Sequence, residues 1–158
     1  MADAAEAAAH AKEYEVEEER VEHLAVAVVR HYYESQGFEV KNVSRARGEH
    51  GGYDLLAIKG SERITAEVKG CTRPYGIPDP YCTEFDPESR RLIADVLCVV
   101  YFPPATETPR LAIIPRDDIP PEYIIEKRAY RISGKFKKKE VISKFFVEKN
   151  LPVQGISR

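Results

Sequence analysis

The chain has 158 residues with 24 Lys and Arg against 26 Asp and Glu, which gives a formal net charge of −2. No apolar run reaches the roughly 18 residues that a membrane-spanning helix needs, so the composition argues against an integral membrane protein. Three cysteines, Cys71, Cys82 and Cys98, form no C-x-x-C pair, which argues against a disulfide framework and favours a reduced, cytoplasmic location.

The charges are unevenly distributed along the chain. Residues 1–22 hold eight acids and two bases, a net of −6, whereas residues 23–158 hold 22 bases and 18 acids, a net of +4. The segment 126–149 alone has nine bases and three acids, including Lys137, Lys138 and Lys139 in succession. Such a segment can follow a phosphate backbone, or it can simply be a solvated surface. The acidic net charge therefore does not exclude nucleic-acid binding.

Composition divides the chain into three parts. Residues 1–12 are Ala-rich, lack the layout of a secretory signal, and are expected to form a flexible acidic leader. Residues 13–125 are expected to form the folded core, and residues 126–158 a basic extension that packs on it.

The first predicted element is a helix from about Glu13 to Gln36, ended by Gly37. Two adjoining apolar stripes at helical spacing predict that it is largely buried. They contain Val21, Leu24, Ala25, Val28 and Tyr32, and Val26, Val29 and Tyr33. Glu22 projects into the second stripe, where a carboxylate is costly unless it meets a cation or a hydrogen-bond network.

Three strands are predicted next. Phe38–Val43 alternates apolar and polar residues, and Tyr53–Ile58 is a compact apolar strand. After a turn near Gly60, Arg63–Lys69 forms the hairpin partner of Tyr53–Ile58. The polar segment between the first two strands, residues 44–52, is a predicted loop.

The next part begins with an irregular proline-rich excursion over residues 70–87, followed by a predicted helix from Pro87 to Ala94. Val96–Phe102 is continuously apolar, which predicts a strand buried on both faces, and Arg110–Ile114 predicts another strand. A helix that crosses between sheet strands implies a mixed sheet flanked by helices, an α/β fold.

The patterns after residue 115 are weaker. They predict a short strand near Ala129–Ile132 and a basic amphipathic helix from about Lys138 to Asn150.

A candidate site lies on the predicted hairpin. The turn near Gly60 brings Asp54, at the start of one strand, beside Glu67 and Lys69, at the end of the other. Two carboxylates suit Mg²⁺, for which Mn²⁺ is expected to substitute, and the carbonyl of Val68 is a candidate further ligand. The ion would activate water for attack on a phosphodiester, and Lys69 would stabilise the developing charge.

The segments G-Y-D-L-L-A-I (residues 52–58) and T-A-E-V-K-G (residues 65–70) resemble the PD-(D/E)XK nuclease superfamily. Their setting is similar to that in archaeal Holliday-junction resolvases and Mrr-like restriction enzymes. Those proteins also carry a glutamate on the first helix, before a G-F or G-Y turn. Glu22 with Gly37-Phe38 matches this feature, and Glu18, one turn earlier, faces the same way.

The resemblance covers about Val21–Ile114 and implies a restriction-endonuclease-like αβββαβ core. It implies that Asp54 and Glu67 are metal ligands, that Lys69 is the catalytic lysine and that Glu22 is an accessory acid. The expected function is a Mg²⁺-dependent DNA endonuclease, acting as a homodimer in DNA repair, recombination or restriction.

Arg45 and Arg47, in the loop before Asp54, are candidate DNA contacts, as are the three lysines at 137–139. Each of these residues can also be ordinary surface charge. The alternative function is a non-catalytic nucleic-acid-binding or assembly module that retains the nuclease fold. A third interpretation is a structural domain in which Glu67 and Lys69 form a solvated cross-strand ion pair.

Overall fold

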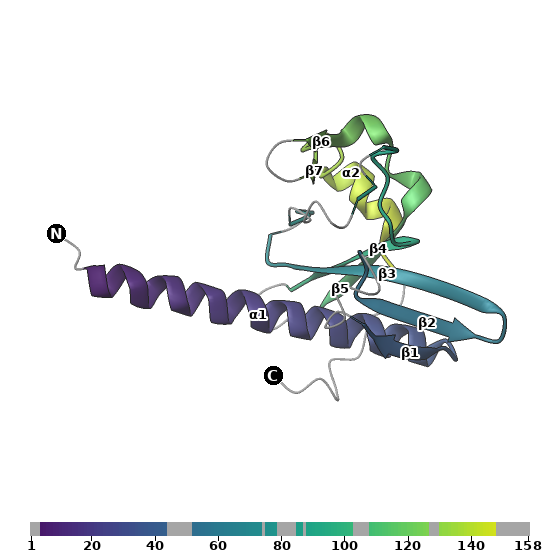
Figure 1. Cartoon of the computed structure of the whole chain (residues 1–158), viewed down its shortest axis with the longest axis horizontal. Coiled ribbons are helices and arrows are strands. Elements are labelled where there is room, and N and C mark those ends of the chain that lie inside the picture. Colours follow the sequence, from purple (N-terminus) through teal and green to yellow (C-terminus); the bar gives the residue numbers. More distant parts are fainter. Residues whose placement is uncertain are drawn as a thin grey trace.

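The structure is a computed structural model that describes residues 4–43, 52–73, 75–78, 85–86, 88–102, 108–126 and 130–147. It is an α/β fold built on a five-stranded mixed sheet (Figure 1). A long helix lies on one side of the sheet, and the C-terminal elements lie on the other. In the described part of the chain, no helix is both long enough and apolar enough to cross a membrane.

Helix α1 spans Ala4–Ser35 and begins nine residues before the predicted start at Glu13. Alanine has the highest helix propensity, and the alanines at positions 4–11 explain the longer element. The predicted end is confirmed, because Gly37 has φ of 89° and Phe38 N donates to Tyr33 O at 3.0 Å. The N-terminal half of α1 extends beyond the edge of the sheet (Figure 1).

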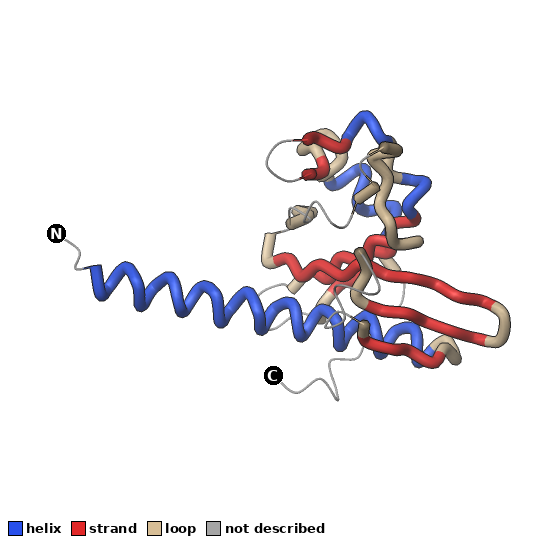
Figure 2. The backbone as a smooth tube through the Cα atoms, in the orientation of Figure 1, coloured by secondary structure: helices blue, strands red, loops and turns tan. Residues whose placement is uncertain are grey.

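The sheet has the strand order β1-β2-β3-β4-β5. These strands are β1 (Glu39–Asn42), β2 (Leu55–Lys59), β3 (Glu62–Cys71), β4 (Val96–Tyr101) and β5 (Arg110–Pro115). Neighbouring strands are antiparallel except β3 and β4, which are parallel. Figure 2 shows β2 and β3 as a long hairpin, and the predicted mixed sheet is confirmed.

The predicted helix over Pro87–Ala94 is wrong for the described residues of that segment. Phe85 and Leu92 form an antiparallel bridge, and Asp86 N donates to Arg91 O at 2.9 Å, which closes a tight loop. The Asp86 carboxylate accepts hydrogen bonds from the Ser89 hydroxyl and from two backbone N–H groups. These bonds resemble those of a helix N-cap, but no helix follows in the described residues, because Arg90 takes the left-handed conformation at φ 57° and the chain reverses into the Phe85–Leu92 bridge. The expected αβββαβ order therefore lacks its second helix in the described residues.

The C-terminal part forms short elements. They are β6 (Ile124–Glu126), β7 (Tyr130–Ile132), α2 (Lys139–Ile142) and single 3₁₀ turns at Arg116–Asp118, Pro121–Tyr123 and Ser143–Phe145. The short strand predicted at residues 129–132 is confirmed as β7, which pairs with β6.

The helix predicted from Lys138 to Asn150 is wrong beyond Ile142. Phe146 bridges Ala112, and Val147 N donates to Leu111 O at 2.9 Å, so the chain there covers the outer edge of β5. Pairing of this exposed strand edge replaces the predicted helix. Residues 148–150 lie outside the described part.

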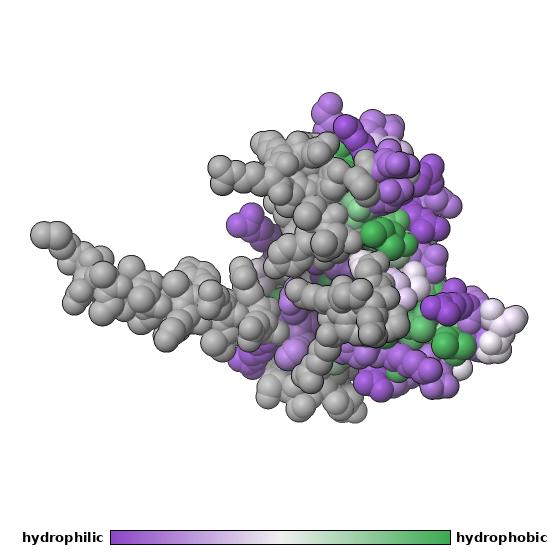
Figure 3. All heavy atoms as spheres, in the orientation of Figure 1, coloured by the Kyte–Doolittle hydropathy of each residue, from purple (hydrophilic) through white to green (hydrophobic). Residues whose placement is uncertain are grey.

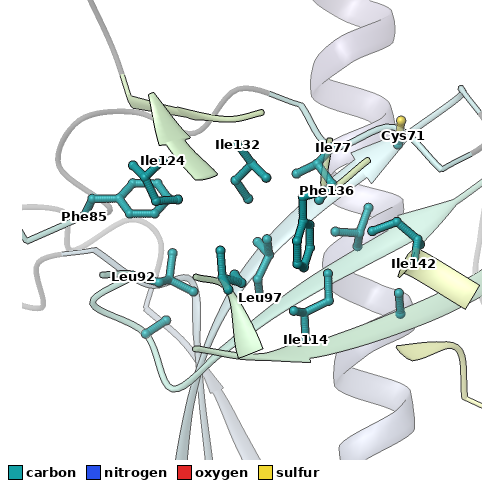
Figure 4. Close-up of a cluster of buried hydrophobic side chains, with 14 of the residues drawn as sticks. Cys71, Ile77, Phe85, Leu92, Leu97, Ile114, Ile124, Ile132, Phe136 and Ile142 are labelled. Carbon is teal, nitrogen blue, oxygen red and sulfur yellow. The ribbon is translucent and has the colours of Figure 1, made fainter. Parts of the chain in front are cut away.

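Hydrophobic clusters lie on both faces of the sheet, and β4 contributes alternate residues to each. Cys98 and Val100 pack toward α1, whereas Leu97, Val99 and Tyr101 pack toward the C-terminal elements. Figure 4 shows the second cluster, in which Cys71, Ile77 and Phe136 lie together. The prediction that this strand is buried on both faces is confirmed. The described surface on the face drawn in Figure 3 is mainly hydrophilic.

Candidate active site

Asp54 lies directly before β2, where the pairing of β2 with β3 ends. Its backbone N donates to Ala66 O at 2.9 Å, and its carbonyl accepts from Val43 N at 2.8 Å. The last registered pair of the two strands is Leu55 with Ala66, whereas β3 continues to Cys71. The Asp54 carboxylate fills the vacated position, because its Oδ2 atom accepts a 2.9 Å hydrogen bond from Val68 N.

The same strand break orients the carbonyl of Val68. The N–H and C=O groups of one strand residue point to the same side of the strand. Because the Val68 N–H points to Asp54, its carbonyl is directed toward the same edge of β3. This edge therefore presents a carboxylate and a backbone carbonyl.

Glu67 follows Ala66, the residue whose carbonyl accepts the Asp54 N–H, and precedes Val68, whose N–H donates to the Asp54 carboxylate. Lys69 is two residues further along β3, on the same face as Glu67. Both side chains are buried, at 3% and 5% exposure, and Lys69 Nζ lies 2.8 Å from Glu67 Oε1. The Asp54 carboxylate therefore bonds the backbone of Val68, the residue between the paired Glu67 and Lys69.

This pairing is not the solvated surface pair that the sequence left open. A buried ion pair offsets its desolvation only when both charges are well satisfied. Glu67 and Lys69 therefore stabilise each other in a position where either charge alone would be costly.

The negative charges of Glu67 and Asp54 also act on the neighbouring strand β4. Cys98 of β4 pairs in register with Val68, and its thiol is fully buried. Burial raises the pKa of the Cys98 thiol, and the negative charges of Glu67 and Asp54 raise it further, against a hydrogen bond with Tyr33 that lowers it. The thiol therefore stays protonated, and it provides no thiolate ligand at neutral pH.

Glu22 is exposed on α1, so the expectation that it projects among buried neighbours is wrong. The helix does reach the site, because Val21 lies against Gly70, next to Lys69. A Cβ atom on Gly70 would lie 2.6 Å from Val21 Cγ1. No three His, Cys, Asp or Glu side chains in the described ranges form a group that could hold a metal, so Glu22 does not complete a set with Asp54 and Glu67.

The structure describes three of the five basic residues that were predicted to contact DNA. Lys138 and Lys139 are exposed, and Lys137 is partly buried beside the buried Phe136. Arg45 and Arg47 lie outside the described residues.

Two further features follow β3. Tyr75 packs edge-on against Phe146 with ring centroids 6.2 Å apart. Arg73 is exposed four residues after Lys69, and sequence reasoning did not single it out. The one sequence feature that could have indicated Arg73 is that it is a basic residue soon after the E-x-K motif.

The carboxylates of Asp54 and Glu67 and the carbonyl of Val68 are oxygen ligands that suit a hard divalent cation, and the Lys69 ammonium group suits an anionic substrate. The described side chains supply two carboxylates at this point, and Mg²⁺ commonly binds through one or two carboxylates and keeps several waters.

No protein-family model matches the chain, and no curated protein or solved structure was found to match it.

Proposed function

We propose that this protein is a divalent-metal-dependent DNA endonuclease of the PD-(D/E)XK type, with a restriction-endonuclease-like core. The observation that carries the proposal is the strand break at Asp54. There the Asp54 carboxylate accepts a hydrogen bond from Val68 N, the residue between the buried and paired Glu67 and Lys69. An acid pair and a lysine in this context are the residues that metal-assisted phosphodiester hydrolysis requires.

Asp54, Glu67 and the Val68 carbonyl would hold Mg²⁺, or Mn²⁺ in its place. A bound ion supplies polarisation of a phosphate oxygen and lowers the pKa of water. Lys69 carries its positive charge 2.8 Å from Glu67, and a phosphate entering beside Glu67 would be met by this ammonium group. Glu22, exposed near Gly70, is available to orient solvent at the site's edge but is not required as a ligand.

The substrate proposal rests on charge. The described segment 134–147 holds five lysines and one acid, and its exposed lysines would contact phosphates. The described residues of one chain offer one such acid pair, and a second copy would place an equivalent pair on the other strand of a duplex, so we propose a homodimer as the active form.

A cleavage assay tests the enzyme proposal. Purified protein is incubated with supercoiled, linear and branched DNA in Mg²⁺, Mn²⁺ or EDTA, alongside Asp54→Asn and the control Asp118→Asn, an exposed acid near the end of β5. Cleavage that requires the metal and survives only in the control supports the proposal. No cleavage of any DNA form, or equal cleavage by Asp54→Asn, contradicts it.

The burial of Glu67 and Lys69 favours one alternative, a non-catalytic nucleic-acid-binding module that retained the fold. An ion pair this buried has a structural role even without chemistry. The alternative predicts salt-sensitive DNA binding that is indifferent to divalent metal and to Lys69→Ala, together with no cleavage.

A further inference from the structure

We infer that the outer edge of β1 is the surface through which two copies of this chain pair, so that their sheets continue into one another. The strand that occupies this edge is β1 of a second copy, antiparallel and centred on Val40. The inference rests on the homodimer of the proposed function and names its surface. It does not depend on the chemistry of Asp54, Glu67 and Lys69.

The two edges of the sheet differ in the described part of the chain. At β5, Phe146 bridges Ala112, so the C-terminal segment covers that edge. At the opposite edge, β1 pairs with β2 on its inner side, and no described strand pairs with its outer side (Figure 2). An uncovered strand edge offers its backbone N–H and C=O groups to another strand.

Val40 directs its backbone groups to this outer edge. Directly after β1, Val43 N donates to Asp54 O at 2.8 Å, so the backbone groups of Val43 face the β2 side. Backbone direction alternates along a strand, so Lys41 and Glu39 also face β2, and Val40 between them faces away from it. Two antiparallel copies centred on Val40 would therefore exchange two hydrogen bonds, each from the N–H of one Val40 to the carbonyl of the other.

The side chains that flank Val40 are complementary to themselves in this register. Glu39 and Lys41 are exposed, whereas Val40 is buried in the cluster under α1, so the two charges lie on the sheet face away from α1. An antiparallel pair centred on Val40 places Glu39 of each copy opposite Lys41 of the other. These are the non-hydrogen-bonded positions, where opposed side chains approach most closely. One two-fold axis therefore forms two ion pairs.

Charged residues on a short edge strand also protect it from unwanted pairing. The charges of β1 favour its own copy, because one charge of each sign lies at equal distance from Val40 along the strand. The four-residue length of β1 limits the contact area. We therefore expect an interface at the small, weak end of specific interfaces, with a dimer that forms only at high protein concentration.

Exchange of the two charges tests the interface. Sedimentation velocity of the full chain, from micromolar to near-millimolar concentration, compares the parent chain with Glu39→Lys, with Lys41→Glu, with the double variant Glu39→Lys/Lys41→Glu, and with an equimolar mixture of the two single variants. The control is Glu122→Lys, which makes the same change of charge at an exposed position in the 3₁₀ turn Pro121–Tyr123. Circular dichroism checks that each variant keeps the fold.

Each single substitution places like charges opposite each other twice across the two-fold axis, and it should weaken dimerisation by about tenfold. The double variant and the mixture of single variants both restore opposite charges at both positions. We expect each of them to dimerise within about threefold of the parent chain. Glu122→Lys should dimerise as the parent chain does.

A single variant that dimerises as tightly as the parent chain overturns the interface, because the dimer then uses another surface. An equal loss in Glu122→Lys overturns it too, because net charge would then decide. A double variant as weak as the single variants also overturns it, because the register centred on Val40 is then wrong. A parent chain that stays monomeric overturns both the interface and the proposed homodimer, whereas the cleavage assay decides the metal-dependent hydrolysis separately.

Discussion

The Asp54 carboxylate and the backbone N–H of Val68 form a 2.9 Å hydrogen bond at the point where β2 no longer pairs with β3. The Asp54 side chain accepts the hydrogen bond that a backbone carbonyl of β2 would otherwise accept. The same carboxylate therefore ends the strand pairing and belongs to the candidate site. Its structural and chemical roles can be separated by substitution.

Asp54→Ala removes the acceptor of the partly buried Val68 N–H and should lower the free energy of unfolding by about 1–3 kcal/mol. Asp54→Asn keeps a carbonyl oxygen at that position and should stay within about 1 kcal/mol of the parent chain. Urea unfolding followed by circular dichroism measures both. Equal destabilisation by the two substitutions would show that the charge, rather than the hydrogen bond, stabilises the strand end.

The buried Glu67–Lys69 pair should behave differently from an exposed pair. Glu67→Gln and Lys69→Met each remove one partner of the buried 2.8 Å ion pair and should cost about 3–5 kcal/mol of stability. The double variant should cost much less than their sum. The matched control is the exposed pair Arg30–Glu34 on α1, whose coupling should be only about 0.3–0.5 kcal/mol.

A double-mutant cycle by urea unfolding gives both coupling energies. If Glu67 and Lys69 couple as weakly as Arg30 and Glu34, the two charges are not held against each other in a dry environment. Glu67 and Lys69 would then not form a buried ion pair.

Gly70→Ala should disturb the contact between α1 and β3. A Cβ atom there would lie 2.6 Å from Val21 Cγ1 and 2.9 Å from the Val21 carbonyl oxygen, so the helix backbone has to move. We expect a loss of about 1–3 kcal/mol in unfolding free energy, as is typical of overpacking. Gly134→Ala, with no atom within 4 Å of the added Cβ, should be near neutral, and similar effects at both positions would refute this close approach.

The Asp86 loop has a predicted response to acid. Hydrogen bonds from the Ser89 hydroxyl and from backbone N–H groups lower the pKa of the Asp86 carboxyl below its usual value. The loop's stabilisation by this carboxylate is therefore complete above the unfolded-state pKa and is lost as the pH falls through the lower, folded-state pKa.

Ser89→Ala should raise the Asp86 pKa toward its ordinary value, whereas Ser61→Ala, in the exposed β2–β3 turn, should not change it. Carboxyl chemical shifts followed by NMR through an acid titration measure this. An Asp86 pKa that is the same in both variants would contradict the assigned role of the Ser89 hydroxyl.

Local sequence patterns correctly predicted the elements whose conformation depends on their own residues, such as β4 and the end of α1. Val96–Tyr101 is apolar on both faces because both faces are covered, and Gly37 ends α1 because the helix end needs a positive φ. The hairpin turn at Gly60 placed Leu55 opposite Ala66, and therefore Asp54 near Glu67, since antiparallel register follows directly from the turn.

The patterns failed where a nonlocal or side-chain contact decides the conformation. The bridge between Phe85 and Leu92 closes a tight loop at Arg90 where a helix was predicted. Phe146 leaves the predicted C-terminal helix to pair with Ala112 of β5. Glu22 is exposed although Val26, Val29 and Tyr33 of its stripe pack in the cluster beneath α1, so periodicity alone does not indicate where along the helix the covered part begins.

The most direct test of the central claim is Mn²⁺ binding to the full chain, counted from the electron paramagnetic resonance signal of free Mn²⁺. We expect one saturable Mn²⁺ site in the parent chain and in Asp118→Asn. In Asp54→Asn we expect the Mn²⁺ affinity to be weakened by about tenfold or more, with the fold unchanged. A parent chain that binds no Mn²⁺, or an Asp54→Asn variant that binds it equally well, would contradict the claim that Asp54 and Glu67 hold a divalent ion.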